Sequence, residues 1–150
     1  MMPQVVLTEE CMRLISQFES LTGAGSRDCV VDNRNERIIF VINPGDMGLA
    51  IGKSGSSIKK ASEVMGKRIE VVEYSTDPAQ FLRNCFLPAQ VTGVDFDTNE
   101  EDQQVAHIEV RSEDRGLAIG KAGTNIFKAK VLALRQHDIA DVVLMQNEAA

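Results

Sequence analysis

Aromatic and cysteine residues are scarce in this sequence of 150 residues. There is no tryptophan and only one tyrosine, and aromatic side chains make up 5% of the chain. The three cysteines, Cys11, Cys29 and Cys85, are odd in number and form no CxxC pair, which excludes a disulfide framework and a zinc site of the usual spacing. We therefore expect no metal or other cofactor, and reduced thiols indicate a cytoplasmic protein.

Long apolar stretches are also missing. No window approaches 18 consecutive apolar residues, and the N-terminus has no basic start followed by an apolar run. The sequence therefore predicts a protein that is neither exported nor inserted in a membrane.

What the sequence does contain is an internal repeat. The segment Gly48–Gly55, GLAIGKSG, returns 68 residues further along as Gly116–Gly123, GLAIGKAG, and the first six residues are identical. Three more residues recur at the same offset: Ile58, Lys60 and Ala61 return as Ile126, Lys128 and Ala129. A period near 70 residues is too long for a solenoid unit. It predicts two small domains, residues 1–74 and 75–150.

The expected order of elements is the same in both halves. Apolar positions at helical spacing predict a helix from Leu7 to Leu21, and Asp77-Pro78 begins the opening helix of the second half. Each half continues with a hairpin, a glycine loop between two helical segments, and a final strand. The sequence thus predicts an α+β fold in which each domain is a three-stranded sheet packed against helices. Residues 146–150 are expected to fray.

Basic residues are concentrated at the two repeated motifs, although the net charge of the chain is minus 6. Residues 47–68 hold five basic residues against Glu63 alone, and residues 115–135 hold five basic residues and no acid. An acidic body therefore carries two basic strips. This distribution predicts local recognition of a polyanion, and the same residues also suit solvated helix faces.

The glycine loops permit three interpretations. A phosphate loop of a nucleotide-binding enzyme requires four residues between its first glycine and the Gly-Lys pair, whereas Gly48 and Gly116 leave three, and Ala122 stands where Ser or Thr binds magnesium. In the second interpretation, the glycines only let the chain turn from one helix into the next. The third is an anion-binding loop, because glycine lets a partner approach closely and the following helix presents unsatisfied N–H groups.

Ile51–Gly55 and Ile119–Gly123 resemble the I-G-x-x-G signature of KH domains, whose GxxG loop clamps about four nucleotides of a single strand. In each half a helix and two strands precede the loop and one strand follows it. This order resembles the prokaryotic-type (type II) KH domain. The resemblance implies two tandem KH domains that bind single-stranded RNA without catalysis.

The joint between the halves carries a more specific resemblance. Residues 73–84, EYSTDPAQFLRN, and residues 88–91, PAQV, are similar to the tandem KH region of the NusA transcription factors. This resemblance covers nearly the whole chain, and it implies an RNA-binding factor in transcription elongation and termination with the transcription machinery as a partner. Bacterial members place further domains before the KH pair, whereas here the first KH domain begins at the N-terminus. We therefore expect the short archaeal type.

The resemblance places the RNA-binding loops on residues 52–55 and 120–123, and lysines on the following helices are expected to extend each site. The candidate RNA-binding residues are Gly52, Lys53, Ser54, Gly55, Lys59, Lys60, Gly120, Lys121, Ala122, Gly123 and Lys128. Four isoleucines either line apolar grooves beside the loops or belong to the core: Ile51, Ile58, Ile119 and Ile126.

Phe127 stands where the first copy has Lys59, so the second site offers one aromatic side chain. It either stacks a base or packs between the two domains. Because aromatic residues are so few, we expect contacts to phosphates and base edges to dominate binding.

Two other functions stay open. A KH pair that serves as a scaffold would bind ribosomal RNA or a protein, and it would prefer a structured RNA or a protein surface to short single strands. A nucleotide-binding enzyme would bind ATP or GTP saturably with magnesium.

Overall fold

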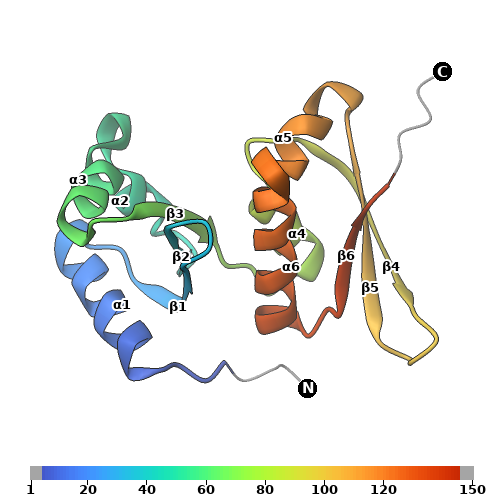
Figure 1. Ribbon diagram of the computed structural model, residues 1–150, viewed down its shortest axis with the longest axis horizontal. Coiled ribbons are helices and arrows are strands. Elements are labelled where there is room, and N and C mark those ends of the chain that lie inside the picture. Colours follow the sequence, from blue (N-terminus) through green and yellow to red (C-terminus); the bar gives the residue numbers. More distant parts are fainter. Residues whose placement is uncertain (1–4, 146–150) are drawn as a thin grey trace. The chain divides into compact units, whose positions relative to one another are not determined.

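The computed structural model describes residues 5–145. They fold as two compact units, Val6–Tyr74 and a second that begins at Ser75. Each unit has one three-stranded sheet, in the order β1-β2-β3 in the first and β4-β5-β6 in the second. The α-helices and strands follow one another in the same order in both units (Figure 1), and the second unit has one additional 3-10 turn. The α+β fold with two helix-packed, three-stranded sheets is confirmed.

The first unit opens with α1 (Glu9–Thr22). Thr8 caps this helix, because its Oγ1 accepts a hydrogen bond from the Cys11 backbone N–H at 3.1 Å, and Gly23 ends it with a φ of 83°. The remaining elements are β1 (Ser26–Asp32), β2 (Arg37–Ile42), α2 (Met47–Ile51), the 3-10 turn η1 (Lys53–Gly55), α3 (Ser56–Met65) and β3 (Arg68–Glu73).

The second unit opens with α4 (Pro78–Phe86). Asp77 caps it as expected, since Asp77 Oδ1 accepts from the Ala79 backbone N–H at 3.1 Å and Pro78 occupies the first turn. The remaining elements are β4 (Val91–Thr98), β5 (Gln104–Val110), η2 (Ser112–Asp114), α5 (Arg115–Ile119), η3 (Lys121–Gly123), α6 (Thr124–His137) and β6 (Asp141–Leu144). The C-terminal residues that we expect to fray, 146–150, lie outside the described residues.

The glycine loops lie in the crossover of each sheet. In both units the first two strands pair antiparallel, and the middle strand pairs parallel with the last. Parallel strands need a long crossover connection, and here two helices with a glycine loop between them supply it. The pairing of β2 with β3, and of β5 with β6, therefore fixes both ends of the loop-bearing segment.

The core of each unit lies between its sheet and its helices. In the first, the Phe18 ring of α1 stacks on the Phe40 ring of β2 with centroids 4.3 Å apart. In the second, Ile108 of β5 is fully buried, together with residues of the opening and closing helices: Phe81, Leu82 and Phe86 of α4, and Leu132 and Ala133 of α6. The opening and closing helices of this unit, α4 and α6, pack against each other.

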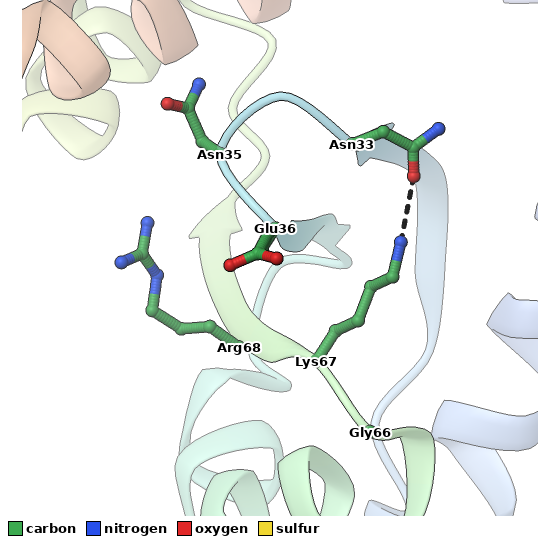
Figure 2. A pocket seen from close by; sticks show the side chains of 6 residues that line it. All are labelled: Asn33, Asn35, Glu36, Gly66, Lys67 and Arg68. Atoms are coloured by element: carbon green, nitrogen blue, oxygen red, sulfur yellow. Dashed lines mark hydrogen bonds between the residues drawn. The ribbon is translucent and has the colours of Figure 1, made fainter.

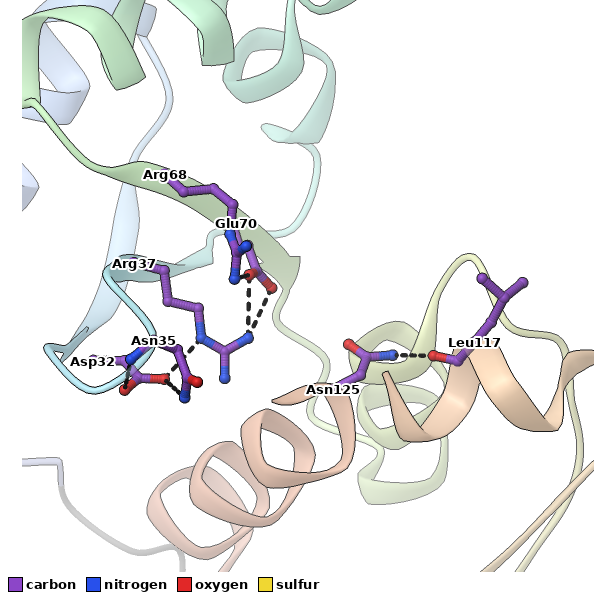
Figure 3. A network of polar contacts seen from close by, with 7 residues as sticks. All are labelled: Asp32, Asn35, Arg37, Arg68, Glu70, Leu117 and Asn125. Atoms are coloured by element: carbon purple, nitrogen blue, oxygen red, sulfur yellow. Dashed lines mark hydrogen bonds and ion pairs between the residues drawn. The ribbon is translucent and has the colours of Figure 1, made fainter. Parts of the chain in front are cut away.

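A buried arginine marks the first unit. The Arg37 side chain is 1% exposed, with its Nε 2.8 Å from Asp32 Oδ2 and its Nη1 3.1 Å from Glu70 Oε2 (Figure 3). Asn35 Nδ2 also donates to Asp32 Oδ2 at 2.8 Å. Burial acts to raise the pKa of Asp32, but the hydrogen bonds from Asn35 and Arg37 outweigh it, so this pKa lies below its ordinary value.

Each unit also contains a buried thiol. Burial raises the pKa of Cys85 in α4 to about 12, and burial, followed by the nearby Cys11, raises the pKa of Cys29 in β1 even further. The Cys11 thiol donates to the Cys29 carbonyl oxygen at 3.1 Å and is only partly buried. Both buried thiols therefore stay protonated and unreactive in the folded chain.

Candidate nucleic-acid interface

The two glycine loops have the same backbone conformation. Gly52 and Gly120 have φ/ψ of 75°/171° and 77°/169°. The third loop residue is left-handed in both copies, at 56°/29° for Ser54 and 55°/29° for Ala122. The final glycines are left-handed as well, with φ near 77°. A loop repeated so closely in two units is specified by its own sequence.

The first glycine of each loop is required for two reasons. Its backbone conformation is one that only glycine adopts readily, and a Cβ at Gly52 would lie 2.6 Å from the backbone nitrogen of Ser57. At Gly120 a Cβ would lie 2.7 Å from the backbone nitrogen of Asn125. The chain thus passes directly against the first turn of the following helix. A Cβ at the last glycine would make only an ordinary contact, 3.9 Å from Ile58 or 4.0 Å from Ile126, so this glycine is needed for its positive φ alone.

An aspartate fixes the start of each loop-bearing segment. Asp46 Oδ2 accepts from the backbone N–H of Gly25 at 2.9 Å, and Asp114 Oδ2 accepts from the backbone N–H of Gln90 at the same distance. Both donors stand directly before the first strand of their sheet. These aspartates are absent from the candidate residues above, although their 68-residue spacing is the signal that could have found them.

The tips of both loops are free for a ligand. The two central residues, Lys53 and Ser54 in the first loop and Lys121 and Ala122 in the second, are exposed. The helices that follow, α3 and α6, begin at Gly55 and Gly123 without a side-chain cap. The N–H groups of Ser56 and Thr124 donate to the carbonyl oxygens of Lys53 and Lys121. The N–H groups of the next two helical residues and the positive end of the helix dipole face the loop. Backbone donors, a dipole and a lysine favour a phosphate there.

The expected basic strip of the first unit divides into two parts. Lys53, Lys59 and Lys60 are exposed on the loop and the first two turns of α3. Lys67 and Arg68 come after the far end of this helix, about 15 Å away at a rise of 1.5 Å per residue. Only the first three can therefore serve the loop.

Those two distant residues line a separate pocket with Asn33, Asn35, Glu36 and Gly66 (Figure 2). Lys67 Nζ donates to Asn33 Oδ1 at 2.8 Å, and Arg68 Nη2 lies 3.1 Å from Glu70 Oε2. Arg68 is thus paired with a carboxylate and Lys67 is hydrogen-bonded to an amide within the unit, so this pocket is a weaker anion site than the loop.

Lys128 does not lie where the sequence pattern indicates. Its side chain is only 6% exposed, and it belongs to the buried stripe of α6 that continues through Ala129, Leu132, Ala133 and Gln136. The positive charge of Lys128 also acts to lower the pKa of the nearby buried Cys85 thiol, although burial raises that pKa by more. Lys128, which we expect to extend the second site, is thus largely buried, whereas Lys60 at the same place in the first unit is exposed.

The apolar candidates divide by exposure. Ile51 is 39% exposed and Phe127 is 47% exposed. Ile58 is partly buried against the core of the first unit, and Ile119 and Ile126 are half-buried. Sequence reasoning missed Leu49 and Leu117, which occupy the same place in the repeat and are both 52% exposed.

The polar contacts around the loops differ in one respect. Asn125 Nδ2 donates to the Leu117 carbonyl oxygen at 3.0 Å and thereby ties α6 to α5 (Figure 3). The first copy has Ser57 at this position.

Comparison with known families agrees with this geometry. The profile of the KH domain matches residues 14–92, and that of the NusA-like second KH domain matches residues 78–144. The chain belongs to the NusA-like tandem KH family. Within this family it is of the short archaeal type.

Several NusA-like relatives match over most of their length. The probable transcription termination protein NusA of Halobacterium salinarum is 40% identical over 92% of this chain and 96% of its own. The protein of the same name from Methanocaldococcus jannaschii is 34% identical over 98% of this chain and 79% of its own. The crystal structure of APE1850 aligns with a TM-score of 0.83 and 36% identity, covering 93% of this chain and 100% of that one.

Two further features of the described residues bear on the site. They include no group of three or more His, Cys, Asp or Glu side chains arranged to hold a metal ion. Over the same residues, no helix has the length and apolar character needed to cross a membrane.

Proposed function

We propose that this NusA-like chain binds single-stranded RNA at both GxxG loops, without catalysis, as a factor in transcription elongation and termination. One observation supports this most: two separate units contain the same strained loop, with an exposed tip and an uncapped helix start behind it.

The chemistry at each loop suits a nucleotide backbone. The absent side chains at the glycines let a phosphate approach the main chain, and helix N–H groups supply donors aimed at it. Lys53 and Lys121 each add a positive charge at the tip. Single-stranded RNA meets these demands better than a duplex, because its backbone can follow the loop while its bases remain available.

Two loops on one chain make binding depend on the length of the RNA. Once one loop is occupied, the other meets the same strand at a high effective concentration. A strand long enough for both loops should therefore bind more tightly than a strand of about 4 nucleotides, the length that one KH domain holds.

Fluorescence anisotropy with labelled RNAs of about 4, 8 and 12 nucleotides, against a matched duplex and at two salt concentrations, tests the proposal. We expect salt-sensitive binding that strengthens with strand length and exceeds binding to duplex. Lys53→Asp/Ser54→Asp and Lys121→Asp/Ala122→Asp should each weaken it. Arg13→Asp, on the exposed side of α1, is the control for added negative charge.

Unchanged affinity in both loop variants would rule out the loops as the binding site. Preference for duplex or structured RNA, or no binding at all, would favour a scaffold that docks on ribosomal RNA or protein. Saturable binding of ATP or GTP with magnesium would favour an enzyme.

A further inference from the structure

The flanks of the two loops differ although the loops themselves are alike. The fourth residue of α3 is Lys59, and the fourth residue of α6 is Phe127. A long side chain at this position leans toward the preceding turn of the helix. Here that turn contains the last loop glycine, Gly55 or Gly123. The residue at this position is therefore a neighbour of whatever the loop holds.

Positive charge is concentrated at the first loop. Lys53, Lys59 and Lys60 are all exposed there. No ion pair within the described residues joins any of the three to a carboxylate. The first loop thus offers three cations to a phosphate backbone.

Among the described residues of the second loop and the first two turns of α6, Lys121 is the one exposed cation with no carboxylate partner. Lys128 is buried, and Lys130 Nζ lies 3.4 Å from Asp141 Oδ1. Arg115 donates to the carbonyl oxygen of Met145. Of the basic residues nearest the second loop, one is thus buried and one is ion-paired, whereas the three at the first loop are exposed.

What the second loop has instead is an exposed aromatic ring. Phe127 is 47% exposed and precedes the buried stripe of α6, which begins at Lys128. It lies one turn from Gly123. A base stacks well on such a ring, whatever its identity, because every base has a π-face.

We infer that the two loops hold RNA by different forces: the first mainly by charge, the second by stacking a base on Phe127. This inference rests on the proposed RNA binding. It makes Phe127 a determinant of affinity that is insensitive to salt, and Lys59 and Lys60 determinants that are sensitive to salt.

The first test separates the loops by their salt dependence, using the full chain and a labelled RNA of about 4 nucleotides. The Lys53→Asp/Ser54→Asp variant leaves the second loop, and Lys121→Asp/Ala122→Asp leaves the first. For single strands the slope of log affinity against log salt is about −0.7 per phosphate neutralised. We expect a slope of about −2 for the first loop and about −0.7 for the second.

The second test removes the ring. In the variant that retains only the second loop, Phe127→Ala should weaken binding by about tenfold, the order of one base–aromatic stack, with the salt slope unchanged. Phe127→Tyr should retain affinity. Leu134→Ala, at another exposed apolar position of α6, is the matched control and should have no effect. An RNA that carries 2-aminopurine should lose fluorescence on binding to the wild-type ring and keep it with Phe127→Ala.

The reciprocal exchange, Lys59→Phe with Phe127→Lys, leaves two cations at each loop and should bring both slopes to about −1.4. If the loop variants weaken RNA binding while Phe127→Ala matches wild type, the inference is wrong and the proposed function stands. If neither loop variant affects binding, the proposed function itself fails.

Discussion

The loops of the two units agree closely, and the sheets beneath them do not. Backbone angles at Gly52 and Gly120 differ by 2°, whereas the strand that leads into each loop has diverged. All six residues of β2 are buried, including Arg37. At the equivalent position β5 has Val105, a half-buried residue.

The cross-strand partners have diverged as well. On β5, His107 pairs with Asp95 of β4 and with Val143 of β6, and both partners are exposed. The equivalent residue of β2, Ile39, is buried, and its partners, Val30 of β1 and Glu70 of β3, are half-buried. The difference teaches that what the two copies share is a backbone path, held by glycines and an aspartate, while the side chains around it are free to differ.

The largest difference in stability between the two units should come from Arg37→Leu. Removing one member of a buried ion pair leaves Asp32 without its charged partner and costs about 3 to 5 kcal/mol in the stability of the first unit. Val105→Leu, which creates the same side chain at the equivalent position, should cost less than about 1.5 kcal/mol. Hydrogen exchange resolved by mass spectrometry reports the two units separately.

The stability lost in Arg37→Leu should also depend on pH. Because the pKa of Asp32 is lowered in the folded state, its contribution is present above about pH 3.9, the ordinary value for Asp, and is lost as the pH falls through the folded pKa. The difference between wild type and Arg37→Leu should shrink below that pH. A constant difference down to strong acid would contradict the ion-pair explanation.

Gly52→Ala and Gly120→Ala should destabilise their units equally, because the two loops have the same backbone conformation. Each adds a Cβ that collides with the next helix in a conformation reserved for glycine, so we expect a loss of about 2 to 3 kcal/mol in each unit. Gly55→Ala and Gly123→Ala meet no close neighbour and should cost about 1 kcal/mol. Urea unfolding curves measure all four, and equal losses at all four glycines would refute the steric argument.

Asp46→Ala and Asp114→Ala test the hydrogen bond from each aspartate to the backbone before the first strand. Each leaves a backbone N–H before the first strand without its carboxylate acceptor, which should cost about 1 to 2 kcal/mol. Asp114 is 8% exposed and Asp46 is more accessible to water, so the larger loss should fall on the second unit. Asparagine at either position retains an acceptor and should restore most of the stability in the same unfolding assay.

The smallest effect should come from Ala122→Gly. Alanine at a φ of 55° is strained, and glycine relieves that strain but adds entropy to the unfolded chain. We expect a gain below about 1 kcal/mol, similar to that of Ser54→Gly at a φ of 56°. A loss of stability in either variant would mean that the side chain makes a contact that supports the loop.

Element order and loop position could be predicted from sequence because they depend on local rules. Thr8, Gly23 and Asp77 mark helix ends by chemistry that acts within a few residues, and the repeat locates both loops. The tie made by Asp46 escaped notice because its donor, Gly25, is 21 residues away.

Burial of charge could not be predicted in the same way. Lys60 and Lys128 occupy the same place in the repeat, but Lys60 is exposed and Lys128 belongs to the buried stripe of α6, the helix that packs against α4. Arg37 begins a strand, where a charged residue is usually exposed, and its partners come from two neighbouring strands. Both outcomes depend on packing between segments that are distant in sequence.

The buried thiols give each unit its own chemical reporter. Cys29 belongs to the first sheet and Cys85 to the opening helix of the second unit, so neither is alkylated while its own unit is folded. The rate at which each is labelled by an alkylating reagent, read by mass spectrometry after proteolysis, therefore measures how often that unit opens. The chain can thus report the opening of its two halves independently, with no probe added to either.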